Sequence, residues 1–171
     1  SNIRKALQSF HSPNGLLDLL KRDHERSVEQ LQNEGMNYLK LRYYQENAIY
    51  AVENAINQSQ TNILVAMATG TGKTRTILGL AYRLLKSERF KRILFLVDRS
   101  ALGEQTEDVM KEFTLEQNQT FSSIYTIADL KVRKSDDAVR VQVATVQAMV
   151  NRLFIDNDNT ISIDEYDCII V

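Results

Sequence analysis

Residues 63–74 read ILVAMATGTGKT, and this stretch decides the fold class of the 171-residue chain. Its first five residues form a short, wholly apolar run, which is typical of a strand buried on both faces of a sheet. The run leads into a glycine-rich segment at residues 69–72. An amphipathic helical pattern follows, with apolar residues at Ile77, Leu80, Ala81, Leu84 and Leu85. We therefore predict a strand, a glycine loop and a helix in this order.

The alternation of strand and helix patterns continues to the end of the chain. Short apolar runs predict strands at residues 93–97, 123–126, 141–145 and 167–171. Amphipathic patterns predict helices at residues 100–113 and 146–153. Together they predict an α/β fold with a parallel sheet and helices on both of its faces.

The first third of the chain has a purely helical pattern. Apolar residues recur at helical spacing between residues 16 and 31, with Asn14 as the expected N-cap and Gly35 as the expected C-cap residue. A second amphipathic helix is predicted from residue 44 to 56. We expect residues 1–40 to form a helical extension and residues 41–171 to form part of an α/β lobe.

Composition places the chain among ordinary globular domains. It is 43% hydrophobic and 25% charged, and it contains no apolar stretch of about 18 residues that would predict a membrane span. The single cysteine, Cys168, has no partner within the chain, which favours a reducing compartment and a cytoplasmic location. The formal net charge is −1, so any surface for nucleic acid must be a local patch.

The glycine loop has the chemistry that a polyphosphate requires. Gly70 and Gly72 allow the backbone N–H groups to approach an anion without a clash from a Cβ atom. The helix that starts near Lys73 adds its positive amino-terminal end. Lys73 can reach the β- and γ-phosphates and the Thr74 hydroxyl can bind Mg²⁺, so these two residues are the predicted catalytic groups. Met67 stands where the common pattern has glycine.

Four segments together resemble successive motifs of superfamily 2 helicases and translocases. They are residues 41–45, 67–74, 96–105 and 144–147, which read LRYYQ, MATGTGKT, LVDRSALGEQ and ATVQ. Their order and spacing are most similar to the motor of the restriction (R) subunit of type I restriction-modification enzymes. The resemblance covers residues 40 to 171 and implies a RecA-like lobe that binds ATP and Mg²⁺.

The resemblance extends the nucleotide site beyond the loop. Gln45 is similar to a glutamine that reads the adenine edge, although a surface glutamine on a helix is the alternative. Arg42 and Tyr44 could flank or stack on the base, with Tyr44 as a plain core residue as the alternative. The full predicted nucleotide-binding set is Arg42, Gln45, Thr69, Gly70, Thr71, Gly72, Lys73, Thr74 and Arg75.

Three further residues match positions at which the family meets the nucleic-acid backbone: Arg99, Thr145 and Gln147. The alternatives are an ion pair of Arg99 with Asp98 or Glu104, and helix capping by Thr145. Basic clusters at residues 83–92 and 131–134 fit a DNA track loosely, but a charge run is usually a solvated face.

The resemblance implies the ATP-binding part of a double-stranded DNA translocase that works with the modification and specificity subunits of a restriction-modification complex. An Asp-Glu-x-His motif is expected directly after Val171, so the 171 residues are expected to be inactive by themselves. No Glu-x-Lys occurs and Asp129-x-Lys131 is incidental, so nuclease residues are not expected here. The alternatives are another superfamily 2 DNA helicase or ATPase, such as a repair type, and a nucleotide-binding switch module.

Overall fold

The computed structural model describes residues 13–98, 108–115, 119–129, 139–154 and 165–171. The helices are α1 (Pro13–Asn33), the short 3-10 helix η1 (Asn37–Leu39), α2 (Tyr43–Asn57), α3 (Lys73–Lys86), α5 (Phe121–Ile124) and α6 (Val146–Phe154). The strands are β1 (Ile93–Val97), β2 (Thr126–Asp129), β3 (Val139–Thr145) and β4 (Cys168–Ile170). Residues 108–112 are also helical, at the end of the helix predicted for residues 100–113.

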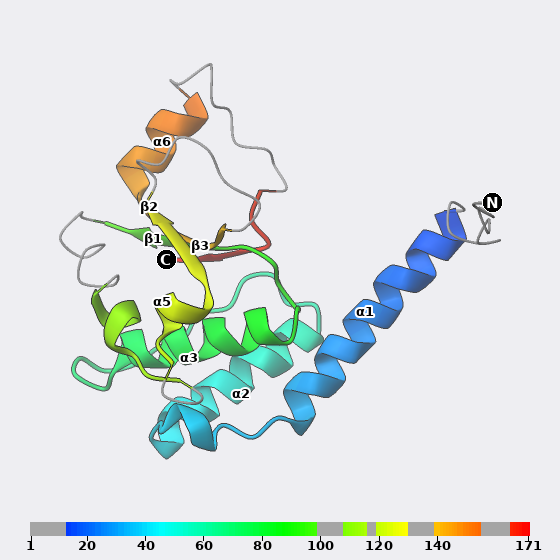
Figure 1. Cartoon of the computed structure of the whole chain (residues 1–171), viewed down its shortest axis with the longest axis horizontal. Coiled ribbons are helices and arrows are strands. Elements are labelled where there is room, and N and C mark those ends of the chain that lie inside the picture. Colours follow the sequence, from blue (N-terminus) through cyan, green and yellow to red (C-terminus); the bar gives the residue numbers. More distant parts are fainter. Residues whose placement is uncertain (1–12, 99–107, 116–118, 130–138, 155–164) are drawn as a thin grey trace, which may run out of the picture.

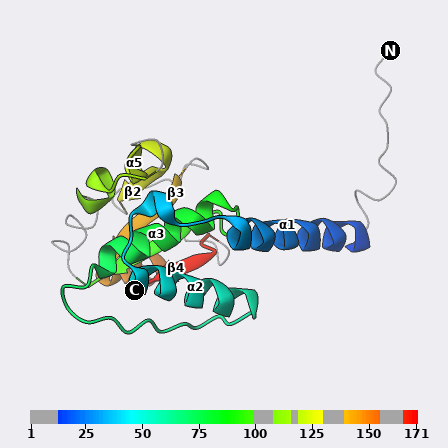
Figure 2. The same cartoon turned by 90° about the horizontal axis from the view of Figure 1, so that it is seen from below.

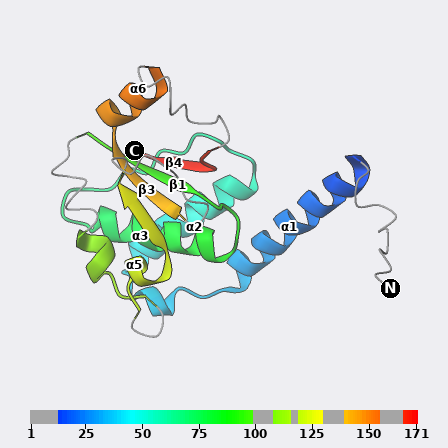
Figure 3. The ribbon, with the colours of Figure 1, turned by 45° about the horizontal axis from the view of Figure 1, so that its top comes forward.

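The four strands form one parallel sheet in the order β2-β3-β1-β4 (Figure 3). Ile93 of β1 pairs with Val141 of β3 on one side and with Cys168 of β4 on the other. Parallel strands place all their carboxyl ends at one edge, where ligands of open α/β sheets bind. The carboxyl end of β1 and the first turn of α3 lie toward the same side of the domain, on the left in Figure 1. The α/β fold with a RecA-like lobe is therefore confirmed.

Helices cover both faces of the sheet, but unequally (Figure 1). On one face the alternate residues Ile93 and Phe95 of β1 and Val141 of β3 join the main core with α2 and α3. On the other face Leu94 and Ala144 form a second, small cluster with Met149 of α6, against which Leu96 and Tyr166 pack. The large apolar core therefore lies between the sheet and the α2–α3 pair.

Helix α1 extends away from the sheet, and only its carboxyl-terminal end reaches the core (Figure 1). Leu31, Met36 and Leu39 are buried in the same cluster as α2 and α3. The helix begins at Pro13, so Asn14 lies inside it and does not act as the predicted cap. It ends at Asn33, two residues before Gly35, which keeps a negative φ and is not a left-handed C-cap. Proline is well suited to the first turn of a helix because it lacks an N–H group.

The strand predicted at residues 63–67 is absent. Residues 61–68 have no regular structure, and the link from α2 to α3 runs along the outside of the domain (Figure 2). The side chain of Leu64 is 95% exposed, and Ile63 and Val65 are also exposed. A strand needs a ladder partner, and within the described residues β4 pairs with β1 alone. An apolar run predicts burial, but it cannot supply the partner.

The strand predicted at residues 123–126 is wrong as well, because residues 121–124 form the helical turn α5 and β2 begins only at Thr126. The Ser123 backbone N–H and hydroxyl both donate to the carbonyl of Thr120, at 3.0 and 2.7 Å. Such local bonds from serine favour a turn over a strand. Phe121 is fully buried and fixes this turn against the core. The strand at 141–145 and the helix at 146–153 are confirmed as parts of β3 and α6.

Candidate nucleotide-binding site

The glycine loop enters α3 through two left-handed residues. Gly70 has φ 77° and Gly72, the N-cap residue of α3, has φ 81°. Side chains disfavour this backbone region, so glycine is needed at both positions. A Cβ atom on Gly70 would meet nothing within 4 Å, whereas a Cβ on Gly72 would lie 2.5 Å from Gln45 Nε2. The surface of the loop at Gly70 is therefore open, and its other side is packed against α2.

Polar contacts fold the loop back on itself. The Thr71 hydroxyl donates to the carbonyl of Ala68 at 2.7 Å, and the Lys73 ammonium donates to the carbonyls of Met67 and Ala68 at 3.3 and 3.5 Å. These bonds are exposed to solvent, and the Lys73 side chain lies at the mouth of the loop. Thr69 and Thr74 are exposed as well. The first N–H groups of a helix have no partner within it, so α3 presents donors next to this ammonium.

Gln45 joins α2 to the loop. Its Oε1 accepts the backbone N–H of Arg42 at 2.9 Å, which closes a capping box at the start of α2. Its Nε2 donates to the carbonyls of Thr71 and Gly72 at 3.0 and 3.3 Å. The side chain is only 4% exposed. Gln45 thus holds the loop in place, and it is not the surface glutamine of the alternative interpretation; the adenine-reading role remains a prediction.

The start of α2 places two more side chains beside the loop. Arg42 Nη1 donates to the Tyr44 hydroxyl at 3.1 Å, and this hydroxyl donates to the carbonyl of Thr71 at 3.2 Å. Tyr43, to which the sequence analysis assigns no role, contacts Tyr44 edge-on at 5.5 Å between ring centroids.

Arg75 lies in the first turn of α3, but its guanidinium is engaged outside the loop. Its Nη2 donates to the carbonyls of Leu39 and Lys40, both at 3.3 Å, and the group stacks over the ring of Phe113 at 5.2 Å. The described contacts therefore make Arg75 an anchor between α3 and the end of η1. Its predicted nucleotide contact stays a prediction.

Two of the three residues predicted to contact DNA lie in the described part of the chain. The Thr145 hydroxyl accepts the N–H of Ala148 at 3.1 Å, which is the helix-capping alternative. Gln147 is exposed and donates to the Asn151 side chain at 3.4 Å. Arg99 lies outside the described residues, as does the basic cluster at 131–134.

Three of the five basic residues at positions 83–92 form ion pairs within the fold. Arg83 is 1% exposed and pairs with Glu53 at 2.6 Å. Lys86 pairs with Glu34 at 2.7 Å and Arg92 with Glu165 at 2.9 Å. These three charges stabilise the fold, and the use of this cluster as a DNA track stays a prediction.

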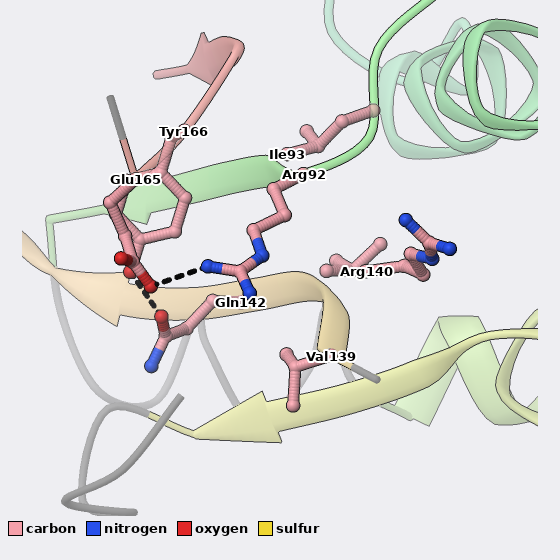
Figure 4. A pocket seen from close by; sticks show the side chains of 8 residues that line it. Arg92, Ile93, Val139, Arg140, Gln142, Glu165 and Tyr166 are labelled. Atoms are coloured by element: carbon pink, nitrogen blue, oxygen red, sulfur yellow. Dashed lines mark hydrogen bonds and ion pairs between the residues drawn. The ribbon is translucent and has the colours of Figure 1, made fainter. Parts of the chain in front are cut away.

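A small pocket at the amino ends of β1 and β3 is separate from the glycine loop (Figure 4). Arg92 points toward Glu165 there, and the Tyr166 hydroxyl contacts the Gln142 side chain. Its interior has room for about one water molecule. The glycine loop is thus the better candidate for a ligand.

Two kinds of feature are absent from the described part of the chain. No helix there is sufficiently long and apolar to cross a membrane. No group of three or more His, Cys, Asp or Glu side chains is placed there to hold a metal ion.

Comparison with known proteins finds similarity to subunits of restriction enzymes. The family model described as type III restriction enzyme, res subunit, matches residues 38–171. Three similar proteins are endonuclease subunits of type I restriction enzymes: EcoKI of Escherichia coli (strain K12), EcoAI of Escherichia coli, and SsaAORF53P of Staphylococcus saprophyticus. They are 46%, 40% and 29% identical over 171, 108 and 135 residues.

These matches cover 99%, 63% and 78% of the chain. The same matches cover 14%, 12% and 14% of the relatives, so the chain spans about a seventh of their length. The chain belongs to the type III restriction enzyme res subunit family and is similar to a helicase-like part of type I endonuclease subunits.

Proposed function

We propose that the glycine loop binds ATP together with Mg²⁺. One observation carries the proposal: two left-handed glycines, an exposed lysine and the start of the 14-residue helix α3 come together at residues 70–74. Backbone N–H groups and the Lys73 ammonium would hold the β- and γ-phosphates, since both are donors aimed at one anion. The exposed Thr74 hydroxyl would bind Mg²⁺, which would neutralise part of the phosphate charge.

The open space at Gly70 fits this proposal. A Cβ atom there would meet no protein atom within 4 Å, so the space above the loop is free for a ligand. Lys73 already bonds two loop carbonyls at the mouth, and it could exchange these for phosphate oxygens without a change of backbone. Because Gln45 and Tyr44 hold Thr71 and Gly72 from behind, the loop is prepared for binding.

We further propose that the chain is the ATP-binding part of an ATP-dependent double-stranded DNA translocase, within the R subunit of a type I restriction enzyme. The match to type I endonuclease subunits supports this, as does the helicase-like family of residues 38–171. Double-stranded DNA and the modification and specificity subunits would be its partners, in the cytoplasm. Arg99, Thr145 and Gln147 stay candidates for DNA contact.

The test compares Lys73→Ala with Lys91→Ala, a change at an exposed lysine outside the loop. Thermal protection by ATP with Mg²⁺ should be present in the unchanged protein and in Lys91→Ala, and lost in Lys73→Ala. All three should melt at the same temperature without nucleotide, because both lysines are exposed. In the protein with its partner subunits, Lys73→Ala should also abolish DNA-stimulated ATP turnover. Full protection or turnover in Lys73→Ala would refute the assignment.

A further inference from the structure

Two short segments of the chain are linked beside the glycine loop: residues 39–45, which lead into α2, and residues 71–75, which lead into α3. Gln45 makes the first link, because its amide nitrogen donates to the carbonyls of Thr71 and Gly72 at 3.0 and 3.3 Å. This side chain is buried, so the link is shielded from water. It runs from α2 to the loop and holds the loop from one side.

Arg75 makes a second link, in the opposite direction. Its Nη2 donates to the carbonyls of Leu39 and Lys40, both at 3.3 Å. The guanidinium carbon lies 5.2 Å from the centre of the Phe113 ring, and Phe113 belongs to the main core. The ring thus supports the face of the guanidinium while one nitrogen reaches the two carbonyls. We call the bonds of Gln45 and Arg75 together the clasp.

The backbone at Lys40 suits a donor in this position. Lys40 has φ 49° and ψ 44°, in the left-handed region that residues other than glycine seldom adopt. Such a conformation persists where the surrounding structure holds it. The carbonyls of Leu39 and Lys40 both accept from the same nitrogen of Arg75, so this side chain helps to hold the turn. The start of α3 and the turn before α2 therefore fix each other.

The amino-terminal half of the glycine loop is held differently. The carbonyls of Met67 and Ala68 accept from Thr71 and Lys73, which belong to the loop itself, and these bonds are exposed. Residues 61–68 have no regular structure. The clasp therefore acts on the half of the loop that leads into α3, where the first N–H groups of the helix have no partner within it.

We propose that Arg75 is a positioning residue for phosphate binding, which fixes the start of α3 through the carbonyls at the end of η1 and the ring of Phe113. The inference rests on the proposed function, because it needs the phosphates to lie at residues 69–74. Donors that are fixed before an anion arrives bind it more tightly than donors that must first be ordered. Without Arg75 the clasp keeps only the link from Gln45, and the first turn of α3 gains freedom that phosphate binding must remove.

This role requires the planar group of arginine. Lysine keeps the positive charge but has no plane to lie on Phe113, so its ammonium is not directed at the two carbonyls. If Arg75 instead touched a phosphate, lysine would serve nearly as well, because it binds phosphate as a point charge. The comparison of Arg75→Lys with Arg75→Met therefore separates positioning from direct contact.

The experiment measures affinity for ATP and for inorganic tripolyphosphate, each with Mg²⁺, by calorimetry well below the melting temperature. Arg75→Met should lose roughly fivefold in affinity for both ligands, which is the scale of one net hydrogen bond. Arg75→Lys should lose nearly as much. Arg140→Met is the control, because Arg140 is an exposed arginine at the amino end of β3. It should bind both ligands as the unchanged protein does.

Phe113→Leu tests the route by which Arg75 acts. It removes the ring that supports the guanidinium and leaves the carbonyls in place, so both ligands should bind roughly threefold more weakly, the scale of an exposed cation–π contact. In the Arg75→Met background the same change should cost no further affinity, because the stacking contact is already gone. Circular dichroism of each variant at the temperature of the titration ensures that only folded proteins are compared.

Unchanged affinity in Arg75→Met would overturn the inference. Full affinity in Arg75→Lys would do so as well, since it would mean that Arg75 acts by its charge. A loss for ATP alone would place Arg75 at the base, and a further loss on adding Phe113→Leu to Arg75→Met would contradict the route. In all these cases the unchanged protein still binds ATP, so the proposed function stands. If it bound neither ligand, the proposed function would fail, and this inference with it.

Discussion

Replacing Arg83 with methionine removes the charged group that joins α1, α2 and α3. Arg83 Nε and Nη2 donate to the two carboxylate oxygens of Glu53, at 2.6 and 3.1 Å. Nη2 also donates to the carbonyl of Leu31 at 2.8 Å, and Nη1 to that of Glu34 at 3.0 Å. Burial alone lowers the pKa of Arg83, but the hydrogen bonds and charge of Glu53 raise it above its ordinary value, so the guanidinium stays charged.

The loss of stability expected for Arg83→Met comes from the buried groups that would lose their partner. Glu53 is 4% exposed and would lose its only described cationic partner, and the carbonyls at the end of α1 would lose their donors. Removing one member of a buried ion pair costs about 3–5 kcal/mol, because the other charge stays buried alone. With a urea m-value of about 2 kcal/mol per molar, the unfolding midpoint should fall by about 2 M.

Urea unfolding followed by circular dichroism measures this shift. Glu53→Gln is the milder variant, since its amide keeps an acceptor for Arg83 but removes the charge, and it should remain folded if Arg83→Met does not. Lys111→Met is the control: its pair with Asp108 is 3.5 Å long and both side chains are more than 60% exposed, so the midpoint should hardly move. Hydrogen exchange at residues 31–35 should accelerate in Arg83→Met.

The double variant Glu53→Leu with Arg83→Met gives the sharpest test. Replacing both charges by apolar groups removes the stranded carboxylate, so the double variant should recover at least half of the stability lost in Arg83→Met. An Arg83→Met protein that unfolds at the same urea concentration as Lys111→Met would refute the reasoning, and so would a double variant less stable than Arg83→Met.

Three other outcomes are expected. Gly72→Ala should lower the melting temperature more than Gly70→Ala. Both glycines have positive φ, but only at Gly72 would a Cβ atom clash with Gln45. An equal fall in melting temperature for the two variants would contradict this. Because Leu64 is 95% exposed, Leu64→Ser should change the free energy of unfolding by less than about 0.5 kcal/mol. A loss above about 2 kcal/mol would mean that residues 63–67 form a buried strand. Burial raises the pKa of the Cys168 thiol from 9.0 to about 11, with a smaller contribution from Asp167. At pH 8 the alkylation of Cys168 should therefore be about 100-fold slower than in the unfolded chain, and it should become faster as the pH rises. Equal alkylation rates in the folded and unfolded chains would refute this.

Most of the fold could be predicted from periodicity. The helices at residues 44–56 and 146–153 and the strands at 93–97 and 141–145 need only an apolar pattern and neighbours to pack on, and all four formed. The run at 63–67 has an equally clear pattern but formed no strand. A pattern specifies what a segment could bury, whereas a strand exists only where another strand's N–H and C=O groups stand beside it.

Only part of the candidate site could be predicted from the sequence. The positive φ at Gly70 and Gly72 could be predicted because few residues other than glycine adopt it, and the spacing to Lys73 follows from the chain. The role of Gln45 could not be predicted, since both an adenine edge and a backbone carbonyl suit the same amide. Only the three-dimensional structure shows that its Nε2 already faces Thr71 and Gly72.

Helix α3 shows why charge alone is a poor guide to ligands. Lys73, its first residue, and Arg83, in its last turn, are both cations on one helix. The sequence assigns Lys73 to a nucleotide, whereas Arg83 belongs to a basic cluster that fits a DNA track only loosely. Lys73 stands exposed where the backbone turns through Gly72, beside donors that have no partner in the helix, so an anion could reach it. Arg83 is enclosed by Glu53 and the end of α1, so its charge stabilises the fold. A cation therefore becomes a ligand contact through its exposure and the donors around it, and the loss of nucleotide binding in an α3 variant can be assigned to the site only when its stability is measured too.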